Sequence, residues 1–302
     1  MSPYVVYTTD FFDRKRRVTL IAHAQLIFSE LSSLRPERDD PRLERNQAVA
    51  TEQFVPAVSP RPRNLILSQL PEAEYAALAK FLVAVDLPLS KSLSEPNQPI
   101  EYVYFVNTGL ISTDALTENG ESVEVGVIGR EGFSGLAALL DQPQMSHSVI
   151  VQGIGEGYRI RASIVRDEFL KGGVFRDLVH AFAYLQLAQM SQSVLCNRMH
   201  TVDARLARWL LTSADRMESE TLNLTQEFLA QMLGTQRSTV TVAAGEMQRD
   251  GMIAYSRGKI QILNRPRLEA AACECYSIVR SSYERILRGY TAGKPEYVFQ
   301  ER

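Results

Sequence analysis

A long amphipathic segment in the second half of the chain constrains the fold more than any other feature. Its apolar residues step by three and four positions, with Gln192 as the only polar break. They are Leu178, Ala181, Leu185, Ala188, Leu195, Met199, Val202 and Leu206. This spacing predicts a helix over Phe175–His200, about 40 Å long at roughly 1.5 Å per residue.

A narrow apolar stripe on so long a helix is typical of a coiled-coil seam. We therefore expect residues 173–201 to form a dimerisation helix. The residues expected along the seam include Leu178, Leu185, Leu195 and Met199. Packing of the stripe against the chain's own domain is the alternative that the pattern leaves open.

The segment before this helix is predicted to form short β-strands separated by turns. The predicted strands are 102–106, 110–116, 122–128, 148–152 and 157–160. Asn119-Gly120 between the second and third of them is a strong hairpin signal. Strands of this length and spacing predict a jelly roll or β-barrel, here a β-roll domain over residues 63–172. Helical spacing over Leu65–Val83 predicts a helix at its start, with Pro71 as the first helical position.

Length and composition indicate an ordinary globular protein of about two domains. Of 302 residues, 45% are hydrophobic and 23% charged, and the net charge is −2. No run reaches the roughly 18 apolar residues of a membrane span, and no apolar signal core is present near the N-terminus, so a cytoplasmic protein is expected. Residues 1–62 are expected to be a poorly ordered leader, because their prolines and charges disfavour helices and central strands.

Three cysteines form no even framework of disulfides, which suits a reducing compartment. They are Cys196, Cys273 and Cys275. The last two fall within Leu268–Leu287, which is predicted to be one helix. There the two side chains would lie on different faces, so helix packing is favoured over a metal or redox role. No metal site and no cofactor is therefore expected.

Residues 224–253 have the pattern of a helix-turn-helix, whose second helix would enter the DNA major groove. Thr225 can cap a short first helix, and Gly234 can supply the left-handed turn after it. Thr235 can cap the second helix, which Gly251 ends. The residues expected to face inward are Phe228, Leu229, Met232, Val240 and Met247.

Two strands flanking Ser256–Lys259 predict a wing with two cations at its tip, suited to phosphate contact. We expect a winged helix-turn-helix over residues 202–267 and a C-terminal helix and tail over residues 268–302. Residues 205–267 carry nine basic and six acidic side chains, a net charge of +3.

The side chains expected to contact bases are Gln236, Arg237, Ser238 and Thr241, with Arg237 as the principal reader. Those expected to contact phosphates are Thr225, Gln226, Thr239, Arg257 and Lys259.

From about Asn64 to Tyr276 this order of elements resembles the Crp–Fnr superfamily of bacterial transcription regulators. The segments that carry the resemblance are Pro99–Phe105, Gly129–Leu136, Asp203–Leu211 and the helix-turn-helix. The resemblance implies an α+β chain with an N-terminal β-roll sensor domain, a long dimerisation helix and a C-terminal winged helix-turn-helix. It also implies a homodimer on two-fold symmetric, double-stranded operator DNA, with RNA polymerase as a further candidate partner.

The sensor site departs from the cyclic-nucleotide-binding pattern of that superfamily. In the pattern a glutamate holds the ribose, and an Arg-Ser or Arg-Thr pair holds the cyclic phosphate. Here the glutamate position, beside Gly135, falls on Leu136, and the Arg-Ser pair falls on Ser146 and His147. A phosphate without its arginine would lack its main counter-charge. These residues therefore predict a degenerate pocket that binds no cAMP or cGMP tightly, which leaves another effector or none.

Other chemistries and function classes have less support. The iron–sulfur branch of the superfamily needs a cysteine cluster that the β-roll and its flanks lack. A haem branch exists, in which His147 could in principle be an axial ligand, but a lone loop histidine is more often simply solvated. No Gly-rich phosphate loop, histidine pair or nucleophile motif indicates an enzyme. An adaptor that keeps the fold without binding DNA is the remaining alternative.

Overall fold

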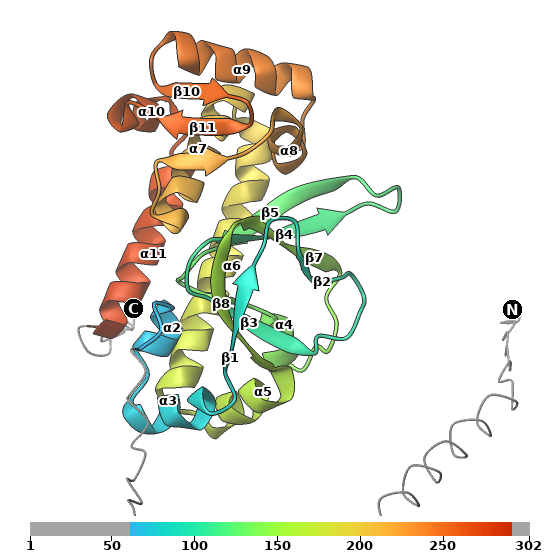
Figure 1. Cartoon of the computed structure of the whole chain (residues 1–302), viewed down its shortest axis with the longest axis vertical. Helices are drawn as coiled ribbons and strands as arrows, with labels where there is room; N and C mark the ends of the chain where they lie inside the picture. The colour runs from blue at the N-terminus through green and yellow to red at the C-terminus, as the bar shows by residue number, and fades with distance from the viewer. Residues whose placement is uncertain (1–60, 292–302) are drawn as a thin grey trace, which may run out of the picture. The chain divides into compact units, whose positions relative to one another are not determined.

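The computed structural model describes residues 61–291, and of residues 285–291 the backbone alone (Figure 1). All but the last two residues of the expected leader lie outside this part, as do residues 292–302 of the expected tail. No helix among the described residues is long and apolar enough to cross a membrane.

Two four-stranded antiparallel sheets form the predicted β-roll, in the orders β1-β8-β3-β6 and β2-β7-β4-β5. The strands are β1 (Val83–Leu87), β2 (Ser92–Ser94), β3 (Tyr102–Val106), β4 (Leu110–Leu116), β5 (Ser122–Ile128), β6 (Phe133–Ser134), β7 (His147–Gly153) and β8 (Gly155–Arg161). The expected hairpin joins β4 and β5, and Gly120 in its turn has a φ of +83°. Fully buried Phe105 and Phe133 contact each other in the core, with ring centroids 5.1 Å apart and ring planes tilted by 40°.

The helix predicted within Leu65–Val83 is in fact two short helices, α2 (Leu65–Ser68) and α3 (Glu72–Ala79). Pro71, the predicted first helical position, is instead the N-cap of α3, which begins one residue later at Glu72. Its ring fixes φ and removes a backbone donor, which interrupts the helical ladder between α2 and α3. Val83 begins strand β1 rather than ending a helix.

After α5 (Ala162–Lys171), the predicted long helix is α6 (Gly173–Met199). Its expected seam is wrong at two of the four named positions. Leu178 is buried in the β-roll core, and Leu185 is buried against Val279 and Tyr283 of the same chain. These two residues pack against the chain's own core, which is the alternative that the sequence pattern left open. Leu195 and Met199 remain exposed.

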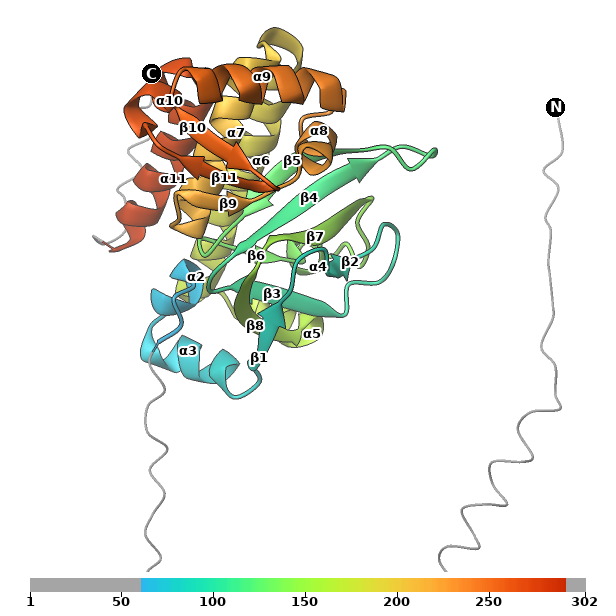
Figure 2. The ribbon, with the colours of Figure 1, turned by 45° about the horizontal axis from the view of Figure 1, so that its top comes forward.

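The C-terminal part is a winged helix around a three-stranded sheet of order β10-β11-β9. Its elements are α7 (Val202–Met217), β9 (Thr221–Asn223), α8 (Gln226–Met232), α9 (Arg237–Arg249), β10 (Ile253–Ser256) and β11 (Lys259–Ile262). Trp209 of α7 is buried in its core. Figure 2 shows α9 lying across one end of α7, next to the wing strands.

The single helix expected over Leu268–Leu287 is wrong, because the chain breaks between α10 (Arg265–Ala271) and α11 (Cys275–Thr291). The two helices have different partners: α10 packs on α7, and α11 packs on both α6 and α7 (Figures 1 and 2). One straight helix cannot pack against both sets of partners, so the backbone turns at Ala272, whose conformation is extended. Cys273 consequently lies in the link and not in a helix.

Candidate DNA-binding face and sensor pocket

The helix-turn-helix begins as the sequence predicts. Thr225 Oγ1 accepts a hydrogen bond from the Phe228 amide at 3.1 Å, and Gly234 has a φ of +55° in the turn. The expected cap at Thr235 is wrong, because the N-cap of α9 is Gln236. The Thr235 amide instead bonds to the Ala230 carbonyl at 2.9 Å, so Thr235 still belongs to the turn that ends α8.

Helix α9 has one buried face and one exposed polar face. The buried residues are Val240, Ala243, Ala244 and Met247, which pack in the winged-helix core. The predicted DNA contacts on the other face, Gln236, Arg237, Ser238, Thr239 and Thr241, are all exposed. Val242 shares that face and is 62% exposed. An apolar side chain on a reading helix can contact the methyl group of thymine.

A notch of about 270 Å³ brings α8, α9 and the wing together. It is lined by Thr225, Gln226, Arg237, Tyr255, Arg257 and Gly258, of which four were predicted DNA contacts. Thr241 Oγ1 lies 2.9 Å from Gln226 Oε1, which ties the two helices together. Tyr255, a residue not foreseen, donates its hydroxyl to the Leu224 carbonyl at 3.1 Å and so fixes the wing beside α8.

The wing has the predicted shape, and its cations are exposed. Ser256 pairs with Lys259 across the turn, where Arg257 has a φ of +49° and Gly258 one of +76°. The local charge balance overstates the positive surface, however. Arg205 is buried, and Arg216 and Arg265 are held in ion pairs with acidic residues away from this face.

The sensor pocket is a cavity of about 170 Å³ between the β-roll and α6. Its lining is Thr113, Ile128, Phe133, Ser134, Gly135, Leu136, Ala137, Leu140, Met145, His147, Val149, Phe182, Gln186 and Met190. Ser146, predicted to line it, is exposed instead, with Oγ 3.3 Å from His147 Nδ1. No lysine or arginine is among these described lining residues, and burial lowers the pKa of His147 and favours its neutral ring. Nothing in the lining offers a positive charge to a phosphate.

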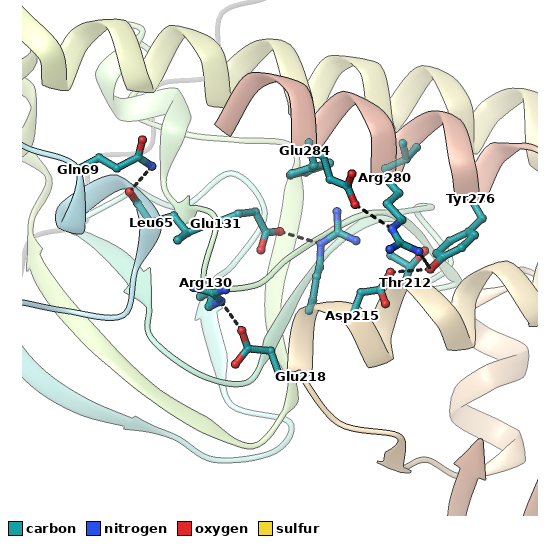
Figure 3. A pocket seen from close by; sticks show the side chains of 13 residues that line it. Leu65, Gln69, Arg130, Glu131, Thr212, Asp215, Glu218, Tyr276, Arg280 and Glu284 are labelled. Carbon is teal, nitrogen blue, oxygen red and sulfur yellow. Dashed lines mark hydrogen bonds and ion pairs between the residues drawn. The ribbon is translucent and has the colours of Figure 1, made fainter. Parts of the chain in front are cut away.

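A larger cavity, of about 470 Å³, lies where the β-roll, α7 and α11 meet (Figure 3). Beside it Arg216 Nε donates to Glu131 Oε1 at 2.7 Å, with both side chains less than a tenth exposed. Arg216 also donates to Gln189 Oε1 at 2.8 Å, and so does the Tyr283 hydroxyl at 3.0 Å. This buried network joins the sensor domain to α6, α7 and α11, and sequence spacing gave no sign of it.

A second contact between the β-roll and α7 centres on the only tryptophan. Trp209 Nε1 donates to Glu124 Oε1 at 3.0 Å, and Gln152 donates to Glu124 Oε2 at 2.8 Å. Burial raises the pKa of Glu124 to about 7, although the hydrogen bonds from Gln152 and Trp209 lower it. Nearby, Gln231 of α8 donates to the Ser122 hydroxyl at 2.6 Å. The β4–β5 hairpin therefore touches the helix-turn-helix directly.

Comparison with known proteins gives matches to both halves of the chain. Residues 86–171 match the model of the cyclic nucleotide-binding domain, and residues 204–271 match that of the Crp-like helix-turn-helix domain. Together these cover about half of the chain. The transcriptional regulator SdrP of Thermus thermophilus is 28% identical over 184 residues, which are 58% of this chain and 85% of that protein.

Solved structures show the same fold. A crp/fnr-family protein from Eubacterium rectale matches with a TM-score of 0.56 and 19% identity, over 68% of this chain and 96% of its own. FixK2 from Bradyrhizobium japonicum matches with a TM-score of 0.54 and 18% identity, over 64% of this chain and 98% of its own. At these identities the likeness concerns the fold alone.

Proposed function

Because the chain belongs to the Crp–Fnr superfamily of DNA-binding transcription regulators, we propose that it reads its operator through the exposed face of α9 and that its sensor domain works without a cyclic nucleotide. The observation that carries the first part is the notch formed by α8, α9 and the wing. It gathers Arg237 and Arg257 beside the hydroxyl of Thr225 and the amide of Gln226.

In this proposal Arg237 is the principal base reader. It lies at the start of α9, where reading helices meet base edges, and arginine can bond guanine O6 and N7 bidentately. Its ion pair with Glu227 is long, 3.7 Å, and exposed, so DNA can replace it at little cost. Gln236, Ser238 and Thr241 are the further base contacts. The phosphate contacts are Thr225, Gln226, Thr239, Arg257 and Lys259.

The protein acts in this proposal as a homodimer through α6. Large apolar side chains are exposed along one stripe of this helix, with Val194 at 71% and Met199 at 70%. The stripe consists of Tyr184, Leu187, Val194, Leu195 and Met199. A parallel pairing along it would present two α9 helices to half-sites about 34–36 Å apart. Contact with RNA polymerase stays a prediction.

The second part of the proposal concerns the effector. The pocket's neutral, mostly apolar lining favours a small uncharged ligand or none, because a cyclic phosphate there would be buried without a counter-charge. We propose no catalytic role for any residue of either domain.

A footprint on the DNA upstream of the protein's own gene, with and without cAMP, tests both parts. We expect a palindromic footprint of roughly two helical turns that cAMP leaves unchanged. Arg237→Ala is expected to weaken specific binding about 10- to 100-fold, the equivalent of ~1–3 kcal/mol, and to leave non-specific binding nearly intact. Arg249→Ala removes the same charge from the other end of α9, where Arg249 pairs with exposed Glu246, and serves as the matched control.

Specific binding that survives Arg237→Ala unchanged would remove the assigned base reader. Binding to no sequence in preference to any other would favour the adaptor alternative. A Kd for cAMP below about 10 μM would overturn the second part.

A further inference from the structure

Four metal-ligating side chains outside the DNA-binding face and the sensor pocket converge at the end of α6. Cys196 and His200 lie one helical turn apart at the end of α6, and Cys273 and Cys275 lie at the link between α10 and α11. One ligand atom from each, three Sγ atoms and one ring nitrogen, lies within 4.8 Å of all the others. Among residues 61–291 this is the one such group of histidine, cysteine and acidic side chains.

We propose that these residues form a Cys₃His site for one zinc ion. A tetrahedral ion with Zn–S bonds of about 2.3 Å holds its donor atoms roughly 3.8 Å apart. The Sγ atoms of Cys196 and Cys273 are 3.5 Å apart, and Cys275 Sγ is 3.4 Å from His200 Nδ1. Four protein donors fill a tetrahedron and leave no position open, which is the pattern of a structural zinc site.

Neighbouring side chains form hydrogen bonds with the ligands and orient them, as is usual around metal sites. His200 Nε2 lies 3.2 Å from Glu274 Oε1, so the carboxylate can orient the ring with Nδ1 toward the thiols. Gln192 Nε2 donates to Cys275 Sγ at 3.1 Å. A carboxylate behind a histidine ligand and an amide N–H on a thiolate are both outer-shell partners that fix ligand geometry.

The surroundings also suit the charge of such a site. A divalent ion with three thiolates and a neutral imidazole carries a net charge of −1, which needs compensation at a buried position. All three cysteines are buried. Arg205 and Arg208 of α7 both interact electrostatically with Cys196, and the Nε of each is buried without a hydrogen-bond partner in the described chain. These two guanidinium groups would offset the negative charge.

Other uses of the cysteines fit the geometry less well. A disulfide between Cys196 and Cys273 would leave Cys275 and His200 converging on nothing. An iron–sulfur cluster places several iron and sulfide atoms between its ligands and so spreads them more widely than a single ion does. Donor atoms confined within 4.8 Å of one another favour one ion.

The site lies where the two functional parts meet. Helix α6 ends at Met199, and α7, the first helix of the winged helix, begins at Val202. A metal bound there would link the end of α6 to the segment that follows the wing, and so fix the hinge before the DNA-binding unit. The proposal does not depend on DNA binding, so either can fail without the other.

Metal analysis of the full-length protein, purified without a metal-affinity step, tests the proposal. We expect about one zinc per chain, lost in Cys273→Ser and Cys275→Ser. His180→Gln changes an exposed histidine on the same helix and is expected to keep the zinc. Glu274→Gln, which spares all four ligands, is expected to weaken zinc affinity roughly 10- to 100-fold at unchanged stoichiometry.

A second measurement covers variants that fail to fold. The wild-type protein, stripped with a chelator, is titrated with Co²⁺, whose visible bands report a tetrahedral site and whose near-ultraviolet bands report thiolate ligation. Both are expected to appear at one equivalent and to vanish on zinc addition. Three results would each overturn the proposal. The first is zinc-free protein that also gives no such cobalt spectrum, and the second is iron with acid-labile sulfide in place of zinc. The third is a Cys196–Cys273 disulfide in zinc-free protein.

Discussion

The sensor pocket and the DNA-binding face differ in how much of their superfamily's chemistry they keep. The DNA-binding face has a capped first helix, an exposed polar α9 and a cationic wing around one notch. In the pocket, Leu136 stands where a nucleotide site needs a carboxylate, and exposed Ser146 stands where it needs a guanidinium. The β-roll core is nonetheless complete, with Phe105 and Phe133 fully buried. A fold can therefore persist after its ligand-binding side chains are gone, because core packing and site chemistry depend on different residues.

The largest effect is expected from breaking the network that joins these two regions. Arg216→Ala would leave Glu131 buried without its partner, and loss of one member of a buried ion pair costs about 3–5 kcal/mol. The measurement is urea unfolding at neutral pH. Arg166→Ala, which breaks an exposed ion pair with Asp141, is the control and is expected to cost less than about 1 kcal/mol. Equal costs for the two variants would show that the network does not hold the regions together.

The sequence predicted those parts of both regions that depend on local pattern. Strand β3 matches its predicted bounds, Tyr102–Val106, because its run of aromatic and β-branched residues and the turn after it are encoded by neighbouring residues. The cap at Thr225 and the left-handed turn at Gly234 are local in the same way. These parts of the predicted fold are confirmed.

The predictions that failed concern residues whose positions depend on contacts between distant segments of the chain. Apolar spacing identified α6 but could not tell which stripe covers the chain's own core, so Leu178 and Leu185 were placed on the wrong surface. Cys273 was placed in a helix because no local signal marks the break that lets it meet Cys196, 77 positions earlier. The ion pair of Glu131 with Arg216 spans 85 positions and could not be predicted for the same reason.

A smaller effect is expected at the wing, where charge should act without regard to sequence. Arg257→Ala and Lys259→Ala are each expected to weaken specific and non-specific binding alike and to lower the salt slope of the binding constant by about 1. Titrations of operator and unrelated DNA over a range of salt concentrations measure both quantities. His147→Ala in the pocket should leave that slope unchanged. A wing variant that alters sequence preference but not the salt slope would assign the wing to base reading instead.

The smallest effect is expected at Glu124, the titratable carboxyl by which the β-roll contacts Trp209 of the DNA-binding unit. Burial raises its pKa from an ordinary value of 4.5 to about 7 in the folded protein. Between these two values the folded chain holds a proton that the unfolded chain has released, so stability falls as the pH rises through this window. Below it both states are protonated, and above about pH 7 both are ionised, so the loss is then complete and constant.

Glu124→Gln should therefore reduce the difference in unfolding free energy between pH 5 and pH 8, measured by urea unfolding. The neutral amide keeps a hydrogen-bonding group at this position and has no charge to bury. Glu121→Gln changes an exposed glutamate in the adjoining β4–β5 turn and should leave that difference as in the wild type. If the operator affinity of the wild type also falls over this window and that of Glu124→Gln does not, the hairpin transmits a pH signal that the apolar pocket cannot. If neither variant changes the pH dependence of unfolding, the Glu124 carboxyl ionises in the folded chain as it does in the unfolded one, and the contact with Trp209 is no more than a fixed hydrogen bond.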